Sequence, residues 1–67
     1  MAWLAVNQCG REVWFGGARK PYRSGAIWCQ RDAVNAIECY GIIIPYHSII
    51  ALTGRQLSWR NQPIKVH

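Results

Sequence analysis

The sequence predicts a small α+β fold: an antiparallel sheet of four to five strands with an N-terminal hairpin and one short helix. Two short runs rich in Val, Trp and Phe flank a turn near the N-terminus, which indicates the hairpin. An isoleucine run ends at Pro45, which indicates a further strand, and a helix-like segment then closes on Gly54. With 67 residues the chain is predicted to form a single small domain, residues 1–67.

The N-terminal hairpin consists of the runs AWLAV and REVWF. Between them, Asn7 and Gly10 hold the first and fourth positions of a turn, which fits a type I turn followed by a left-handed glycine. We therefore expect Asn7 to pair with Arg11. The register then places these residues opposite one another: Val6 and Glu12, Ala5 and Val13, Leu4 and Trp14, Trp3 and Phe15.

The two faces of this hairpin differ in polarity, because partners share a face and faces alternate along a strand. One face is entirely apolar and is predicted to be the core face: Trp3, Ala5, Val13 and Phe15. The pattern leaves open whether the rest of the chain covers the other face, which carries Leu4, Val6, Glu12 and Trp14. Trp14 is therefore the tryptophan best placed to meet a partner.

The middle of the chain is less regular. Residues 16–25, GGARKPYRSG, include three glycines and a proline and are interpreted as a surface loop. A third strand is expected from Ala26 to Cys29. Residues 30–38 carry apolar residues at helical spacing after Asp32, so a short helix there stays an open alternative.

The block CYGIIIPYHSIIALTGRQLSW holds most of the strongly apolar aliphatic residues and is interpreted mostly as core. Residues 41–45 are predicted to be a buried strand, since isoleucine favours the pleated backbone and proline ends the ladder. A helix follows, with Pro45 near its first turn and Gly54 just past its end. Its predicted buried side consists of Ile49, Ile50, Leu52 and Thr53. QLSW and PIKV are expected to form a last strand, interrupted around residues 61–63.

The formal net charge is +5, from eight Lys and Arg against three Asp and Glu. This excess favours acidic partners without specifying one. No segment approaches the roughly 20 apolar residues of a membrane helix, so we expect no membrane partner. The N-terminus also lacks the pattern of a signal peptide, and the three cysteines are interpreted as reduced thiols of a cytoplasmic protein.

The sequence predicts neither an enzyme nor a metal protein. Cys9, Cys29, Cys39 and His47 offer enough ligand atoms, but no close pair such as C-x2-C occurs. A Cys–His nucleophile lacks any recognisable signature, and there is no Gly-rich phosphate loop. We therefore expect no catalytic residue, no cofactor and no metal, and we interpret the thiols as small, buried or half-buried side chains.

The best constellation for nucleic acid lies in the basic loop and consists of Arg19, Lys20, Tyr22 and Arg23. Basic side chains there would neutralise phosphates, and Tyr22 or Trp14 would stack on an unpaired base. The competing interpretation is a solvated loop whose charges keep the protein soluble.

A contact with a larger protein partner is predicted through Trp14, Tyr22 and Arg11, because Trp, Tyr and Arg dominate interface hot spots. An unpaired edge strand of so small a sheet also offers a place for a partner's strand to pair. A homodimer through such an edge stays an open alternative.

Two parts of the chain have a familiar form: the start, WLAV…NQCGREVWF, and the C-terminal half, which follows an outline of four pieces. These are G-I-x-[IL]-P, a short helix closing on L-x-G, L-[ST]-W and P-[IV]-x-[IL], at residues 41–45, 49–54, 57–59 and 63–66. In this outline the chain resembles a group of short bacterial proteins, frequent on phages and mobile elements, with no assigned activity. The resemblance implies an accessory protein that binds a larger host or phage component.

The first functional hypothesis is therefore a small intracellular accessory protein of a phage or mobile element, acting by protein–protein binding as an inhibitor or adaptor. The alternative is a nucleic-acid-binding module that uses the basic loop from Arg19 to Arg23.

Overall fold

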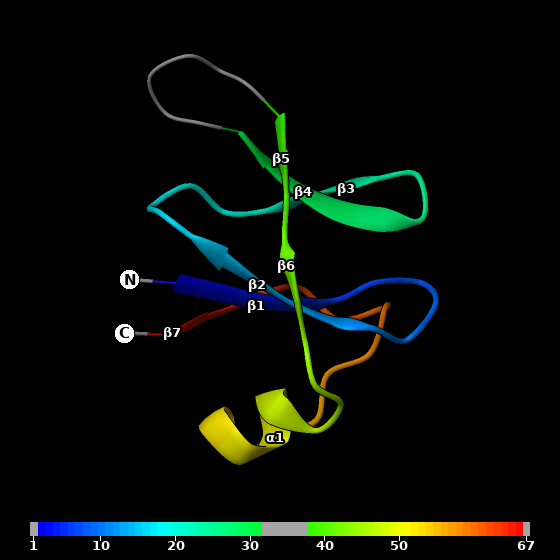
Figure 1. Ribbon diagram of the computed structural model, residues 1–67, viewed down its shortest axis with the longest axis vertical. Coiled ribbons are helices and arrows are strands. Elements are labelled where there is room, and N and C mark those ends of the chain that lie inside the picture. The colour runs from blue at the N-terminus through cyan, green and yellow to red at the C-terminus, as the bar shows by residue number, and fades with distance from the viewer. Residues whose placement is uncertain (1, 32–37, 67) are drawn as a thin grey trace.

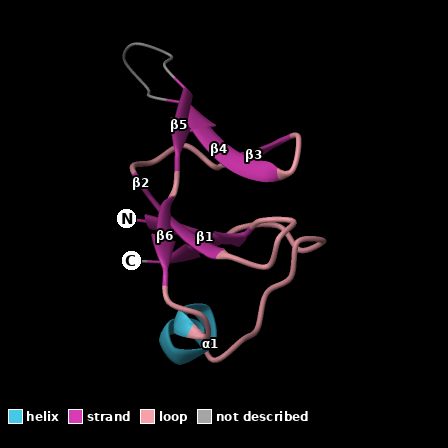
Figure 2. Ribbon diagram, turned by 45° about the vertical axis from the view of Figure 1, so that its right-hand side comes forward, coloured by secondary structure: helices cyan, strands magenta, loops and turns pink. Residues whose placement is uncertain are grey.

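The computed structural model describes residues 2–31 and 38–66. Within these ranges the chain forms two antiparallel sheets and one short helix, stacked as three layers (Figures 1 and 2). The first sheet has the strand order β6-β2-β1-β7 and the second has the order β3-β4-β5. The strands are β1 (Ala2–Val6), β2 (Glu12–Gly16), β3 (Tyr22–Ser24), β4 (Ile27–Arg31), β5 (Glu38–Tyr40), β6 (Ile42–Ile44) and β7 (Ile64–Val66), and the helix is α1 (Ser48–Thr53).

The small α+β character is confirmed, whereas the single sheet of four to five strands is corrected to two sheets of four and three strands. The reason lies in the segment predicted to be a loop, residues 16–25. Its second half forms β3, which pairs with β4 through a two-residue turn that starts at Gly25. Gly25 has φ 64°, a conformation that tight hairpin turns require and that glycine adopts without strain.

The N-terminal hairpin has the predicted register, with Val6 opposite Glu12 and Trp3 opposite Phe15. In its turn, the N–H of Asn7 donates to the carbonyl of Arg11 at 2.9 Å, and the N–H of Gly10 donates to the carbonyl of Asn7 at 2.9 Å. Gly10 has φ 91°, as the left-handed position demands. The turn residues therefore fix which side chains of the hairpin share a face.

The rest of the chain covers both faces of the hairpin and leaves Trp14 partly exposed, which answers the question that the pattern left open. On the predicted core face, Ala5, Val13 and Phe15 pack with Trp28 of the second sheet, with Trp3 and Trp59 at the margin. On the other face, Leu4 and Val6 pack with Ile49 of α1 and with Leu57. The first sheet is thus the middle layer between the second sheet and the helix (Figure 2).

Trp28 holds the second sheet against the hairpin. Its backbone N–H donates to Oδ1 of Asn7 at 3.0 Å, and its indole Nε1–H donates to the carbonyl of Val6 at 2.9 Å. The N–H of Gln8 adds a 3.0 Å hydrogen bond to the carbonyl of Ala26. Because Asn7 is itself buried, these bonds satisfy polar groups that burial would otherwise penalise.

Strands β5 and β6 are separated only by Gly41. Because β5 is an edge strand of the second sheet and β6 an edge strand of the first, this continuous segment runs along an edge of both sheets. A Cβ added to Gly41 would lie 2.9 Å from Cζ of Phe15 and 2.9 Å from Cβ of Val13. Only glycine therefore lets the chain cross this close to the core. The prediction of a buried strand over residues 41–45 is wrong, because β6 is an edge strand and exposes 62% of Ile42 and 59% of Ile43.

Helix α1 ends as predicted. Gly54 follows it with φ 75°, and the N–H of Gly54 donates to the carbonyl of Ile50 at 2.8 Å. The predicted buried side is wrong, because within this six-residue helix only Ile49 is buried. A helix of fewer than two turns has room for one residue over the sheet, which leaves Ile50 and Leu52 outside.

The last predicted strand is shorter than expected. Only Ile64–Val66 forms a strand, and Leu4 pairs with Ile64 in the register of β1 with β7. Residues 57–59 lie outside the sheets, although Leu57 is buried against α1. Of the residues 30–38 considered for a helix, Gln30 and Arg31 belong to β4 and Glu38 belongs to β5, while residues 32–37 lie outside the described ranges.

Candidate functional site

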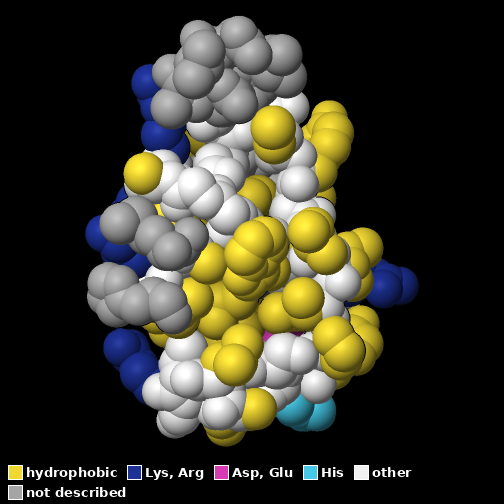
Figure 3. Space-filling view, turned by 60° about the vertical axis from the view of Figure 1, so that its left-hand side comes forward, with side chains coloured by type: hydrophobic (Ala, Val, Ile, Leu, Met, Phe, Trp, Pro, Cys, Tyr) yellow, Lys and Arg dark blue, Asp and Glu magenta, His cyan; other side chains and the backbone are white. Residues whose placement is uncertain are grey.

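A group of large hydrophobic side chains lies on the surface, although a small protein needs such side chains for its core. We call this group the apolar band, and it consists of Trp14, Tyr40, Ile42, Ile43, Tyr46, Ile50 and Leu52. The exposed fractions range from 37% for Trp14 to 70% for Tyr40. In Figure 3, hydrophobic side chains gather along the middle and right of one face, and Lys and Arg side chains lie at its margins.

The topology explains why these residues lie along one edge of the fold. Trp14 lies opposite Ile42 in the register of β2 with β6, so the two share a face, whereas Ile43 lies opposite Val13 on the other face of the edge strand. Tyr40 precedes Ile42 by two residues along the same extended stretch, and the chain then continues from β6 through Tyr46 into α1. The apolar band is therefore built from one nearly continuous segment, residues 40–52, together with one tryptophan from the hairpin.

Trp14 is held in place although it is partly exposed. Its ring lies back over Gly16, where an added Cβ would come within 3.1 Å of Cη2 of Trp14. The absence of a side chain at position 16 thus gives the indole a flat surface on its own strand. A rigid aromatic side chain loses little conformational entropy when a partner covers it.

The backbone of β6 adds a second feature. Strand β6 is the outer strand of its sheet, and among the described residues no strand pairs with its outer side. Such an edge presents a row of N–H and C=O groups to which an extended segment of another chain can add as a strand.

The electrostatics of the surface are one-sided. Of the two carboxylates in the described ranges, Glu12 is buried, and Glu38 accepts a hydrogen bond from Tyr22 Oη at 2.8 Å. This hydrogen bond lowers the pKa of Glu38, with a further contribution from a hydrogen bond to Cys29, and it raises the pKa of Tyr22. Any partner therefore meets a surface on which basic groups greatly outnumber acids.

The residues predicted to contact a protein partner are not all brought together. Trp14 belongs to the apolar band, and Arg11 is exposed in the hairpin turn of the same sheet. Tyr22 is half-buried in the other sheet, where the guanidinium of Arg31 lies 5.7 Å from its ring. The other six residues of the apolar band were missed because their hydrophobicity predicted burial. Pro45 was the available signal, since proline beside a strand is typical of a sheet edge.

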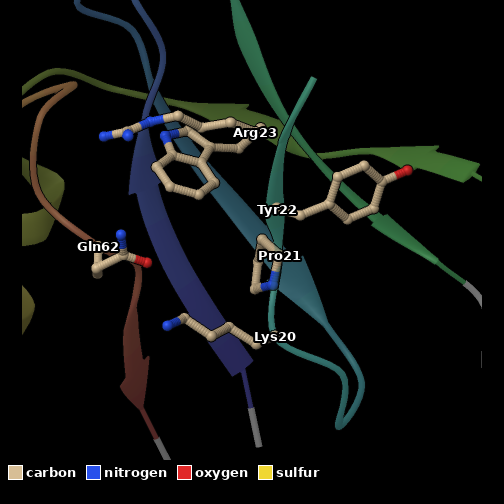
Figure 4. Close-up of a pocket in the computed structure, with 6 residues that line it drawn as sticks. Lys20, Pro21, Tyr22, Arg23 and Gln62 are labelled. Atoms are coloured by element: carbon tan, nitrogen blue, oxygen red, sulfur yellow. The ribbon is translucent and has the colours of Figure 1, made fainter. Parts of the chain in front are cut away.

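The residues predicted to bind nucleic acid are divided between two sides of β3. Arg23 lies opposite Trp28, and Tyr22 lies opposite Cys29, so Tyr22 and Arg23 point to different faces of the sheet. Figure 4 shows Lys20 and Arg23 extending to one side of β3 and the ring of Tyr22 to the other. Arg19 is exposed, and its carbonyl accepts a hydrogen bond from Nε2 of Gln30 at 2.6 Å.

The thiols and His47 form no reactive group that the structure displays. Cys29 is fully buried, and burial together with its hydrogen bond to Glu38 raises its pKa, so the thiol stays protonated. The interpretation of the thiols as buried or half-buried is wrong for Cys9 and Cys39, which are exposed because one lies in the hairpin turn and the other in the edge strand β5. In the described part of the chain, no three side chains of His, Cys, Asp or Glu lie close enough to hold a metal ion.

Comparison with known proteins finds no protein family, no characterised protein and no solved structure that matches this chain. The resemblance to short phage and mobile-element proteins therefore transfers no residue role. None of the helices described is long and apolar enough to cross a membrane. Taken together, the fold and the site define a small α+β protein whose most distinctive surface is the apolar band along a sheet edge.

Proposed function

We propose that this chain is a binding protein that docks onto a larger protein through the apolar band. The observation that carries the proposal is the exposure of seven large hydrophobic side chains along one sheet edge and the adjoining helix. Contiguous exposed hydrophobic groups of this kind mark interaction sites in soluble proteins. A chain of 67 residues needs its large side chains for its core, so seven on the surface represent a substantial cost to stability.

The partner that fits this surface is an extended segment with apolar side chains and acidic flanking residues. The outer side of β6 supports strand addition, because main-chain hydrogen bonds give affinity while alternate side chains give specificity. The net charge of +5 supports acidic flanks and disfavours a second copy, since two such chains repel each other. The proposal keeps the role of a cytoplasmic inhibitor or adaptor from a phage or mobile element.

The alternative of a nucleic-acid module with base stacking on Tyr22 has less support. Tyr22 and Arg23 point to opposite faces of β3, so a nucleotide held by Arg23 does not reach the ring of Tyr22. Trp14, the other stacking candidate, belongs to β2 of the first sheet, whereas Arg23 belongs to β3 of the second.

The test compares tagged wild-type protein with the variant Ile43→Lys as baits in the source cell, with and without nuclease. The control variant is Gln8→Lys, which adds the same charge at an exposed turn position outside the apolar band. We expect wild type and Gln8→Lys to retain one partner after nuclease treatment and Ile43→Lys to lose it. With the purified partner, Ile43→Lys is expected to weaken binding at least about tenfold.

Two results contradict the proposal. One is a partner that binds Ile43→Lys as tightly as wild type. The other is capture that disappears on nuclease treatment for every bait, because the protein is then held through nucleic acid. Light scattering of the purified chain is expected to show a monomer, and a dimer abolished by Ile43→Lys would assign the apolar band to a second copy.

A further inference from the structure

A pocket of about 400 Å³ lies beside β3, away from the apolar band and sharing no residue with it. It is lined by Lys20, Pro21, Tyr22, Arg23, Trp28 and Gln62. This volume falls within the roughly 300–1,000 Å³ of pockets that hold small ligands. Figure 4 shows the side chains of Lys20, Arg23 and Gln62 extending to the same side of β3, with Gln62 contributed by the loop before β7.

Arg23 is fixed in this pocket by its surroundings. Its guanidinium carbon lies 4.9 Å from the ring centroid of Trp28 and 4.9 Å from that of Trp59. One Nη2–H group donates to the carbonyl of Trp59 at 2.7 Å. A guanidinium held in this way has lost its side-chain freedom before any ligand arrives, which lowers the entropic cost of binding. One hydrogen bond uses one of its five N–H donors, so the others remain for a ligand.

No carboxylate in residues 2–31 or 38–66 neutralises this pocket. Glu12 is buried beneath α1, and Glu38 bonds to Tyr22 on the opposite face of the second sheet. Lys20 and Arg23 therefore give the pocket a positive potential, and the amide of Gln62 adds a neutral donor. Two cations and an amide on one side suit an anion with several acceptor oxygens.

The aromatic rings do not provide a stacking platform. Trp28 is only 3% exposed, Arg23 lies over the rings of both Trp28 and Trp59, and the two rings meet edge to face at 5.8 Å. A base would have to displace Arg23 to stack on either ring. A ligand of this pocket is therefore recognised through charge and hydrogen bonding. The identity of a base is expected to have little effect on its affinity.

From this arrangement we propose that the pocket binds a phosphate group, carried either by a free small molecule such as a mononucleotide or by a nucleic-acid strand. Arg23 and Lys20 contact the phosphate oxygens, and Gln62 donates a further hydrogen bond. This proposal is independent of the protein contact described above, because a ligand here leaves the apolar band uncovered.

The experiment follows the backbone and indole NMR signals of the full chain during titration with inorganic phosphate, AMP, adenosine and a single-stranded oligo-dT. We expect phosphate and AMP to shift the signals of Arg23, Trp28 and Gln62, and adenosine to leave them unchanged. If oligo-dT shifts the same signals at lower concentration than AMP, the source is a nucleic-acid strand. If phosphate and AMP shift them and oligo-dT does not, the source is a free phosphate or a small phosphate monoester such as a mononucleotide.

The variant Lys20→Gln tests the site without disturbing the tryptophans around Arg23. It is expected to weaken AMP binding roughly three- to tenfold, as expected for the loss of one exposed charged contact. The control Arg55→Gln removes the same charge at an exposed position after α1 and is expected to change binding less than twofold. Equal weakening by both variants, or equal shifts from adenosine and AMP, would overturn the proposal, since binding would then reflect net charge or ring contacts.

Discussion

The carboxylate of Glu12 accepts the backbone N–H of Ile49 through Oε1 at 2.7 Å, which ties strand β2 to the first turn of α1. Its other oxygen, Oε2, accepts the N–H of His47, also at 2.7 Å. Glu12 is 2% exposed, so a buried charge is balanced by two N–H groups that the helix itself cannot satisfy. Six residues are too few for a stable isolated helix, and this contact supplies what the local sequence lacks.

The first prediction follows from this contact. Glu12→Ala is expected to lower the free energy of unfolding by about 2–3 kcal/mol, because two buried N–H groups lose their acceptor. Glu12→Gln keeps one acceptor oxygen and should lose about half as much. Urea unfolding followed by tryptophan fluorescence measures both, with Arg11→Ala as the exposed control next in the chain. Equal stability of Glu12→Ala and Arg11→Ala would show that the carboxylate does not support the helix.

The second prediction concerns the hydrogen bond between Tyr22 and Glu38. The pKa of Glu38 is lowered from its usual 4.5, so the contribution of this contact is present above about pH 4.5 and is lost as the pH falls through the folded-state pKa. The pKa of Tyr22 is raised from 10.0, so the same contact is also lost as the pH rises through that higher value.

Tyr22→Phe should therefore move the pKa of Glu38 upward toward 4.5. It should also lower the stability of the protein most between about pH 4.5 and pH 10 and little beyond either end, so the dependence of stability on pH becomes flatter. Carboxyl NMR signals of Glu38 report the first effect, and thermal unfolding across the pH range reports the second. Tyr46→Phe, at an exposed position of the apolar band, serves as the control and should leave the titration of Glu38 unchanged.

The hairpin was predictable because its information is local. Asn7 and Gly10 set the turn, the turn sets the register, and the register assigns each strand side chain, residues 3–6 and 12–15, to a face. The end of α1 was predictable for the same reason, since Gly54 closes it within its own last turn. Strand propensity and turn formation depend on residues within a few positions of one another, so both can be judged from a single sequence.

The burial of the isoleucines was not predictable in this way. Ile42, Ile43 and Ile49 are chemically identical, yet the first two are 62% and 59% exposed and the third is 0% exposed. What separates them is the position of β6 at the outside of its sheet, which depends on strand pairing across about thirty residues of chain. Of the candidate site, only Trp14 was singled out, because the hairpin register alone already placed it on the less certain face.

The phosphate pocket was equally inaccessible from sequence. Arg23 was recognised as a basic residue of a loop, but its position depends on Trp59, which lies 36 residues further along the chain. Its cross-strand partner Trp28 became evident only once residues 22–24 were seen to form a strand. A composition rich in glycine and proline concealed a strand that is stabilised by this aromatic contact.

The third prediction concerns Gly41, where the edge segment crosses from one sheet to the other. Gly41→Ala is expected to destabilise the protein by about 1–3 kcal/mol, because the new methyl group would overlap Phe15 and Val13 at 2.9 Å. Chemical unfolding of Gly41→Ala, Phe15→Leu and the double variant forms a double-mutant cycle. The alanine should cost less in the Phe15→Leu background, since the shorter side chain vacates part of the space. Full additivity would mean that the contact with Phe15 is not the cause.

The fourth prediction compares the effect on stability of replacing one isoleucine of the core and one isoleucine of the apolar band. Ile49→Ala should lower the free energy of unfolding by about 2–5 kcal/mol, because it opens a cavity between Leu4 and α1. Ile43→Thr keeps a β-branched side chain on an exposed edge strand, so its stability should stay within about 1 kcal/mol of wild type. Urea unfolding of the two variants, with matching m-values, measures the difference. A large loss for Ile43→Thr would mean that β6 is covered within the protein itself, and the apolar band would then be core rather than a docking surface.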